Sequence, residues 1–207
     1  MCVQTTPDNP NPQRGFTLIE MLVAVAILGI LAAMAAPSLR TFIVRNTFST
    51  IGNEFSASIL RARNEAVSKN MCVTMCMSNT VDTTTGNGPT CLTSGQDWQV
   101  GWIVFLNPDC NSNFNFPQEQ PAAGTVKPEN MLLVRRAGSP DYTLMSISTT
   151  RKILFNPRGN ATLDAAGRFD LVYTKDNTLS NTYGSSICLD KMGRTRPVPA
   201  AVICNTY

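Results

Sequence analysis

The chain has 207 residues, with 17 lysines and arginines against 14 aspartates and glutamates, so its formal net charge at pH 7 is +3. It contains no histidine, which excludes a Ser-His-Asp triad and a histidine-ligated zinc site. The small positive charge by itself says little about binding partners.

The first element is a short polar leader, residues 1–15, which ends in a basic residue and Gly15. An apolar run follows at once, from Phe16 to Ala36, and carries one formal charge, Glu20. In a secretory signal the apolar core precedes the cleavage site and is lost with the leader. Here a cut after Gly15 would remove the polar piece and keep the apolar one. As a helix this run spans roughly 30 Å, about the thickness of one bilayer core.

Glu20 is costly in such a helix, because an unpaired carboxylate near the end of a membrane span costs about 2–4 kcal/mol. One interpretation is a side chain that extends to the membrane surface. The other is a buried ion pair in an assembly. Cleavage would free the α-amino group of Phe16, and such an amine from a neighbouring subunit would neutralise Glu20 in an apolar core.

The string Gly15-Phe16-Thr17-Leu18-Ile19-Glu20 closely resembles the N-terminal motif of type IV pilins and type II secretion pseudopilins. The resemblance implies that a prepilin peptidase cuts after Gly15 and methylates Phe16, and that Glu20 directs filament assembly. It also implies other major and minor pilins as partners, and the inner membrane before assembly. Pro37 lies where this family commonly has a helix-kinking proline.

Beyond Pro37 the sequence has the pattern of an amphipathic helix. Its apolar residues recur mostly every three or four positions: Leu39, Phe42, Phe48, Ile51, Phe55, Ile59, Ala62 and Ala66. We therefore expect one long helix from about Thr17 to about Ser68, apolar all round at first and one-faced later. The apolar face requires a cover, which the rest of the chain supplies as strands.

Strands are predicted where β-rich runs are bounded by Gly, Pro, Asn and Asp. They are Met71–Met77, Val100–Leu106, Met131–Arg136, Tyr142–Ser148, Lys152–Asn156, Phe169–Thr174, Ser186–Asp190 and Val198–Cys204. Two polar loops, 79–99 and 107–130, exceed usual lengths, so they are either functional or stapled.

The expected fold class is α+β, with the type IV pilin-like arrangement of a long N-terminal helix and an antiparallel β-rich domain. The expected organisation is a leader (1–15), a transmembrane or filament-core helix (16–37) and a globular domain (38–207) that includes the amphipathic helix 38–68. The expected location is a single-pass inner-membrane protein with its domain in the periplasm, and then a cell-surface pilus.

The cysteines are Cys2, Cys72, Cys76, Cys91, Cys110, Cys188 and Cys204. Cys2 leaves with the leader, and six cysteines in an oxidising compartment predict up to three disulfides. Cys188 and Cys204 flank a short C-terminal segment and are paired first. The resemblance implies a bond between Cys76 and Cys91, which leaves Cys72 with Cys110, although the connectivity of these four stays open. The alternative is a metal site at Cys72 and Cys76, which no histidine can complete.

Two further strings resemble elements of the GspH/FimT branch of this family, which contains FimT/FimU minor pilins and GspH pseudopilins. One is Trp-x-x-Gly-Trp-x-x-Phe from Trp98 to Phe105. The other is Phe-x-Pro-x-Gly, from Phe155 to Gly159, which overlaps Asn156-Pro157-Arg158-Gly159-Asn160, a segment that also has the pattern of an ordinary hairpin turn. Both strings favour this branch over a major pilin.

The segment from Lys191 to Pro197 holds three positive side chains: Lys191, Arg194 and Arg196. In a loop closed by Cys188 and Cys204, two arginines at this spacing would reach successive phosphates along one nucleic-acid strand. The alternative is a solvated turn with scattered charges. Gly193, Arg194 and Arg196 match the Gly-Arg-x-Arg element of FimT-type minor pilins, and the resemblance implies DNA binding in natural transformation. Candidates to extend the basic patch are Arg135, Arg136, Arg151, Lys152, Arg158 and Arg168.

The leading hypothesis is a minor type IV pilin that takes part in pilus assembly or priming and binds extracellular DNA non-specifically. Its DNA-binding residues are predicted to be Lys191, Gly193, Arg194 and Arg196. The alternative is a GspH-like pseudopilin of a type II secretion system, with the same assembly chemistry and a protein partner. An enzyme is disfavoured, because the chain has no nucleotide-binding glycine loop and no activated-nucleophile motif. We expect no catalytic residue, cofactor or metal.

Overall fold

The computed structural model describes residues 15–82, 89–115, 130–162, 167–200 and 204. The chain divides into two compact units, Met1–Phe42 and Ile43–Tyr207. Apart from Gly15, the expected leader lies outside the described residues.

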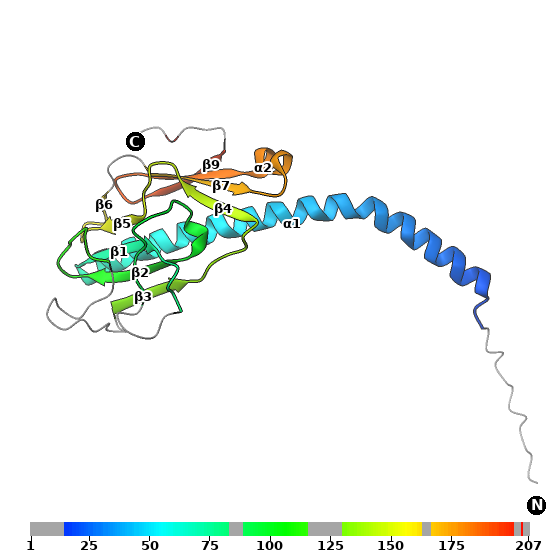
Figure 1. The fold of residues 1–207 in the computed structure, drawn as a ribbon, viewed down its shortest axis with the longest axis horizontal. Coiled ribbons are helices and arrows are strands. Elements are labelled where there is room, and N and C mark those ends of the chain that lie inside the picture. The colour runs from blue at the N-terminus through cyan, green and yellow to red at the C-terminus, as the bar shows by residue number, and fades with distance from the viewer. Residues whose placement is uncertain (1–14, 83–88, 116–129, 163–166, 201–203, 205–207) are drawn as a thin grey trace, which may run out of the picture. The chain divides into compact units, whose positions relative to one another are not determined.

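A single helix, α1 (Leu18–Lys69), runs through both units (Figure 1). Its first turn is capped by Thr17, whose hydroxyl accepts a hydrogen bond from the Glu20 N–H at 3.3 Å. It ends at Asn70, which adopts the left-handed conformation (φ 52°) that commonly closes a helix. The long helix predicted from the sequence is confirmed to within one residue at each end.

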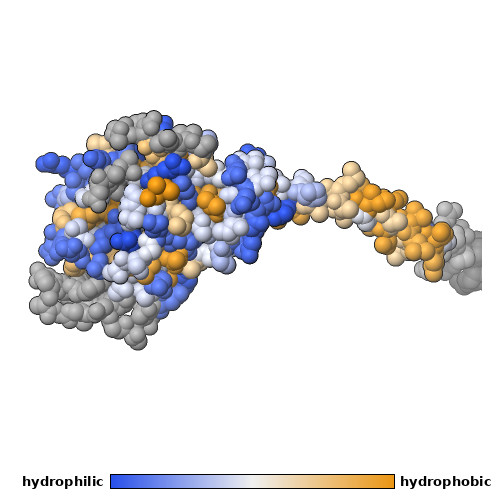
Figure 2. Space-filling view, turned by 45° about the horizontal axis from the view of Figure 1, so that its top comes forward, coloured by the Kyte–Doolittle hydropathy of each residue, from blue (hydrophilic) through white to orange (hydrophobic). Residues whose placement is uncertain are grey.

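In the first unit the helix presents apolar side chains on all sides. Every described residue from Gly15 to Arg40 is exposed, and Figure 2 shows these side chains as an apolar surface. Leu39 and Phe42, predicted to belong to a buried face, are exposed as well. That prediction was wrong because burial of α1 begins only at Val44, in the second unit.

The second unit places the rest of α1 against two antiparallel sheets (Figure 1). One sheet has the strand order β3-β2-β1-β5-β6 and the other β4-β7-β8-β9. The strands are β1 (Cys72–Met77), β2 (Trp102–Asn107), β3 (Met131–Arg135), β4 (Tyr142–Ser146), β5 (Lys152–Phe155), β6 (Ala161–Thr162), β7 (Gly167–Tyr173), β8 (Ser185–Leu189) and β9 (Thr195–Pro199).

Phe55 of α1 is the centre of the core that joins these elements. Its ring lies edge-on to Trp98, Trp102 and Phe169, with centroid distances of 5.2, 5.4 and 4.8 Å. Trp102 belongs to the first sheet and Phe169 to the second, so one aromatic side chain connects both sheets to the helix. The buried apolar positions of α1 recur every three or four residues: Val44, Phe48, Ile51, Phe55, Ile59, Ala62 and Ala66.

Most predicted strands are present, but the last one is displaced. The structure has β9 at Thr195–Pro199, so this strand begins three residues before the predicted range 198–204, because the chain turns back tightly after β8 and pairs Leu189 with Thr195. Residues 201–203 of the predicted strand lie outside the described residues. Three short elements were not predicted: β6, the 3-10 turn at Trp98–Val100, and helix α2 (Asn177–Tyr183). Asp176 caps α2 by accepting hydrogen bonds from the N–H groups of Thr178 and Leu179.

Three disulfides staple the second unit. They join Cys72 to Cys110, Cys76 to Cys91, and Cys188 to Cys204. These are the pairs expected above, and they leave no thiol at Cys72 or Cys76 for the alternative metal site. Cys76 and Cys91 also pack with Ile103 and Phe105 in a small second core. The first two bonds tie both long polar loops to β1.

Candidate filament and nucleic-acid interface

The N-terminal motif lies at the start of α1, with Phe16 and Glu20 both exposed. Glu20 is in the first helical turn, where the positive end of the helix dipole favours a negative charge. Thr17 and Glu20 form the Thr-x-x-Glu pattern of a helix start, so one segment both begins the helix and carries the single carboxylate of the apolar run 16–36. The capping role of Thr17 was not predicted, although this spacing signals it. The helix is long and apolar enough to cross a membrane.

Two hairpin turns of the same construction lie in the second unit, and we call them the twin turns. The first is Asn156–Asn160 and the second is Asp190–Arg194. In each, the first residue's side chain accepts a hydrogen bond from the last residue's N–H, at 3.0 Å and 2.9 Å. In each, the fourth residue is a glycine with positive φ, +80° and +72°. The Asx-x-x-Gly-x spacing therefore indicates a turn whose fourth residue has a positive φ, a conformation that glycine adopts without steric cost.

The twin turns contact each other and α1. The Ala161 N–H donates to the Lys191 carbonyl at 2.9 Å. Arg63 of α1 donates from Nε to the Gly159 carbonyl at 3.1 Å. A Cβ on Gly193 would lie only 2.6 Å from that carbonyl oxygen, so the approach requires glycine there as well. Arg63 therefore belongs to this site, and it was not predicted because a lone arginine on a helix carries no local signal.

Arg194 is held by an ion pair within its own turn. Its Nε lies 2.8 Å from Oδ2 of Asp190, while its N–H donates to the other carboxylate oxygen. Burial of Asp190 raises its pKa, but these contacts with Arg194 and a backbone hydrogen bond from Met192 outweigh that effect, so the pKa lies below its ordinary value. The guanidinium stays largely exposed. Asp190 thus orients Arg194 and neutralises its charge, a role the sequence analysis missed.

Arg196 lies within β9, opposite Cys188 of β8, and is exposed. Thr195 between the two arginines is half-buried, which is the alternation of an extended segment. Lys191 is also exposed. Gly193 is buried between the first twin turn and α1. The four predicted DNA-binding residues therefore lie in one hairpin, with three charged side chains at the surface and the glycine beneath them.

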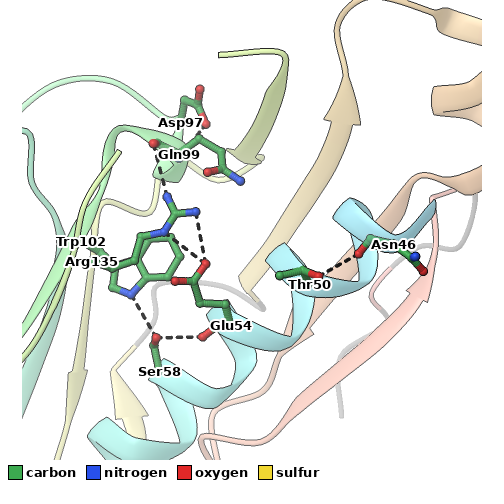
Figure 3. Close-up of polar contacts among 8 residues, drawn as sticks. All are labelled: Asn46, Thr50, Glu54, Ser58, Asp97, Gln99, Trp102 and Arg135. Atoms are coloured by element: carbon green, nitrogen blue, oxygen red, sulfur yellow. Dashed lines mark hydrogen bonds and ion pairs between the residues drawn. The ribbon is translucent and has the colours of Figure 1, made fainter. Parts of the chain in front are cut away.

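Several other candidate basic residues are engaged elsewhere. The Arg135 guanidinium lies over the Trp102 ring and 3.3 Å from the Glu54 carboxylate (Figure 3). The Trp102 indole N–H donates a hydrogen bond to the Ser58 hydroxyl. This cluster ties α1 to the first sheet. Ion pairs join Arg136 to Asp82 and Arg168 to Asp170.

Lys152 donates to the carbonyls of Ser112 and Phe114 and to the Asn115 side chain, and burial lowers its pKa. Arg151 borders the same pocket as Lys152. Of the six candidates, Arg158 alone is part of a twin turn. Arg135, Arg136, Arg168 and Lys152 thus have polar partners of their own, and the extension of the basic patch stays a prediction.

The arrangement can present positive charge, but it offers nothing for metal chemistry in the part of the chain that the structure describes. No group of three histidine, cysteine, aspartate or glutamate side chains is placed there to hold a metal ion. The exposed guanidiniums of Arg194 and Arg196 are suited to hydrogen bonding with phosphate or carboxylate oxygens.

Two family models match this chain, one at its N-terminus and one over most of the remaining sequence. Residues 10–36 match the prokaryotic N-terminal methylation motif, and residues 52–193 match the family described as type II transport protein GspH. The type IV major alpha-pilin of Moraxella bovis is 43% identical over 47 residues, which are 23% of this chain and 30% of that protein. The type IV major fimbrial protein FimA of Dichelobacter nodosus is 50% identical over 42 residues, which are 20% and 27%.

The chain thus matches less than a third of the length of these curated relatives. A crystal structure of the type IV minor pilin FimU from Pseudomonas aeruginosa has a similar fold, with a TM-score of 0.51 and 16% identity. That match covers 79% of this chain and 99% of the FimU chain, so the long helix with its antiparallel sheets is a type IV pilin fold.

Proposed function

This chain belongs to the GspH family of type II transport proteins, and from that premise we propose that it is a minor type IV pilin that binds extracellular DNA. The exposed apolar helix of the first unit, with its single carboxylate, carries the assembly part of the proposal. The exposed Arg194 and Arg196 of the β8–β9 hairpin carry the DNA part.

Assembly follows from the chemistry of the N-terminus. Cleavage after Gly15 by a prepilin peptidase creates a new α-amino group on Phe16, which is then methylated. The helix that follows is apolar on all sides, so it is stable in the inner membrane or among other pilins in a filament. In that setting Glu20 requires a cation, and the amine of a neighbouring subunit supplies one.

The assembly role is tested by Glu20→Gln, which keeps the shape of the side chain and removes its charge. We expect this variant to be processed normally but lost from sheared pilus fractions. Glu65→Gln is the matched control, because that carboxylate lies on the same helix in the second unit and pairs with its helical neighbour Lys69. Normal incorporation of the Glu20 variant would refute the ion-pair mechanism.

DNA binding is supported by the location of Arg194 and Arg196 on one exposed hairpin. Both face solvent on either side of half-buried Thr195, and the Cys188–Cys204 bond closes the segment around them. Guanidiniums at this spacing bind phosphates without reading base edges, which suits uptake of DNA of any sequence. Since each phosphate contact releases counterions, we expect an affinity in the micromolar range or weaker that falls steeply with salt.

The DNA role is tested by a gel-shift assay with the full chain in a non-ionic detergent. We expect Arg194→Ala with Arg196→Ala to remove most binding and to leave the fold intact. Arg135→Ala is not a suitable control, because that residue ties α1 to the first sheet. Arg40→Gln and Arg45→Gln, which remove two exposed charges from α1, form the matched control. Equal retardation of wild type and the Arg194/Arg196 variant would refute the proposed role of the hairpin.

The second candidate is a pseudopilin of a type II secretion system, which the description of the matched family favours. It would use the same membrane helix and ion pair, with a secreted protein as its partner. A gene deletion separates the two candidates. Loss of twitching or transformation with normal exoprotein secretion supports the pilus, and the reverse pattern supports the secretion system.

A further inference from the structure

A groove runs between α1 and the second twin turn, with a cavity volume of about 330 Å³. Ser56, Leu60 and Arg63 line it from the helix, at the four- and three-residue spacing of one helical face. Gly193, Arg194 and Thr195 line it from the hairpin. The lining contains two guanidinium and two hydroxyl groups and no carboxylate.

Arg63 supplies the unbalanced positive charge of this groove. The charge of Arg194 is matched by Asp190 at 2.8 Å. Arg63 instead donates from Nε to the Gly159 carbonyl, and within the described ranges no carboxylate pairs with it. That hydrogen bond fixes the side chain and leaves both Nη groups as donors.

A second groove on α1 has a different character. It is lined by Ala57, Leu60, Arg61, Asn64, Glu65 and Ser68, and so includes a carboxylate. Glu65 lies 3.7 Å from the ammonium of Lys69, its helical neighbour. Glu65 therefore repels an anion in this second groove, whereas the lining of the first groove contains no negative group.

We propose that the groove beside the second twin turn binds one phosphate of a nucleic-acid backbone, with Arg63 and Arg194 as its charged donors. The hydroxyls of Ser56 and Thr195 are positioned to add neutral donors. A guanidinium held at Nε presents its remaining N–H groups in a plane that fits phosphate oxygens. The inference rests on the proposed DNA binding and extends its footprint from the hairpin onto α1.

The glycine of the second twin turn explains how the groove forms. A Cβ at Gly193 would lie 3.0 Å from Cδ of Arg63, so any side chain there would press on the arginine stem. Glycine brings the hairpin close enough for Arg63 and Arg194 to share one ligand.

The first test measures DNA affinity against salt for the full chain in a non-ionic detergent. For Arg63→Gln we expect about tenfold weaker binding and a salt slope smaller by about 1, the change for one lost phosphate contact. Arg61→Gln is the matched control, because Arg61 lies on the same helix but lines the second groove. It should leave the slope unchanged. If both variants behave alike while the wild type binds DNA, the groove assignment is overturned and the proposed function stands.

The second test avoids the Arg63–Gly159 hydrogen bond, so it does not depend on the stability of the Arg63 variant. Leu60 is exposed, and Leu60→Glu places a carboxylate beside the groove, whereas Leu60→Gln adds a neutral group of the same size. We expect the Glu variant to lose most DNA binding and the Gln variant to keep it. Equal binding by the two overturns the assignment.

Inorganic phosphate is the third probe, since it separates the groove from the proposed function. We expect phosphate to shift the amide NMR signals of Gly193 and Thr195 in the wild type, and to shift them less in Arg63→Gln. Wild type that binds phosphate at these amides but not DNA supports the groove and refutes the DNA proposal. Absence of any shift overturns the groove.

Discussion

Replacing Gly193 with alanine tests the central contact between the twin turns. The added Cβ would lie 2.6 Å from the Gly159 carbonyl oxygen, which is backbone and cannot rotate away. The positive φ of +72° costs a non-glycine residue about 1–2 kcal/mol. Displacement of Gly159 also breaks its hydrogen bond from Arg63, which is worth about 0.5–1.5 kcal/mol. We therefore expect Gly193→Ala to lower the free energy of unfolding by about 2–3 kcal/mol.

The assay is urea unfolding with disulfides intact, followed by the fluorescence of Trp98 and Trp102, both fully buried in the second unit. Gly52→Ala is the matched control for the same chemical change. A Cβ on Gly52 would meet only Ile187, at an ordinary 3.9 Å, inside a helix. That variant should gain about 0.5–1 kcal/mol. Equal stability of the Gly193 variant and wild type would refute the close packing of the twin turns.

Three further predictions concern the same unit. Phe55→Ala should lower the free energy of unfolding by about 3–5 kcal/mol, because that ring fills the centre of the core. Phe42 is exposed, so Phe42→Ala should change the free energy of unfolding by less than about 0.5 kcal/mol. Similar losses for both variants would contradict the core assignment. Removal of the Cys188–Cys204 bond by paired serine substitutions should cost about 3 kcal/mol, and an unchanged urea midpoint would show that the bond does not constrain the unfolded chain. Since the pKa of Asp190 is lowered by folding, its carboxylate stabilises the fold at neutral pH, and that contribution is lost as pH falls below its ordinary value of 3.8. The stability advantage of wild type over Asp190→Asn should therefore shrink in acid, and a constant difference from pH 7 to pH 3 would contradict this.

The elements that the sequence predicted well are those with a strong local pattern. The apolar repeat of α1 and the β-rich runs around β1, β2 and β5 gave bounds close to the observed ones. The exposure of Leu39 and Phe42 could not be predicted, because the period of a helix does not tell where its sheet begins.

The candidate site was predicted only as far as its local spacing reached. The Gly-Arg-x-Arg string identified Gly193, Arg194 and Arg196, and a hairpin presents them. Asp190 was missed although it lies four residues before its partner. Arg63 could not be found from the sequence, since it meets the Gly159 carbonyl across a separation of 96 residues. Contacts of this kind depend on tertiary packing, so no periodic pattern in the sequence indicates them.

The mass of the mature chain purified from its host tests the whole account most directly. If the protein is a processed pilin, the chain begins at Phe16 and is one methyl group heavier than the sequence from that residue. A chain that still begins at Met1, or one that has lost the apolar helix together with the leader, would contradict the account.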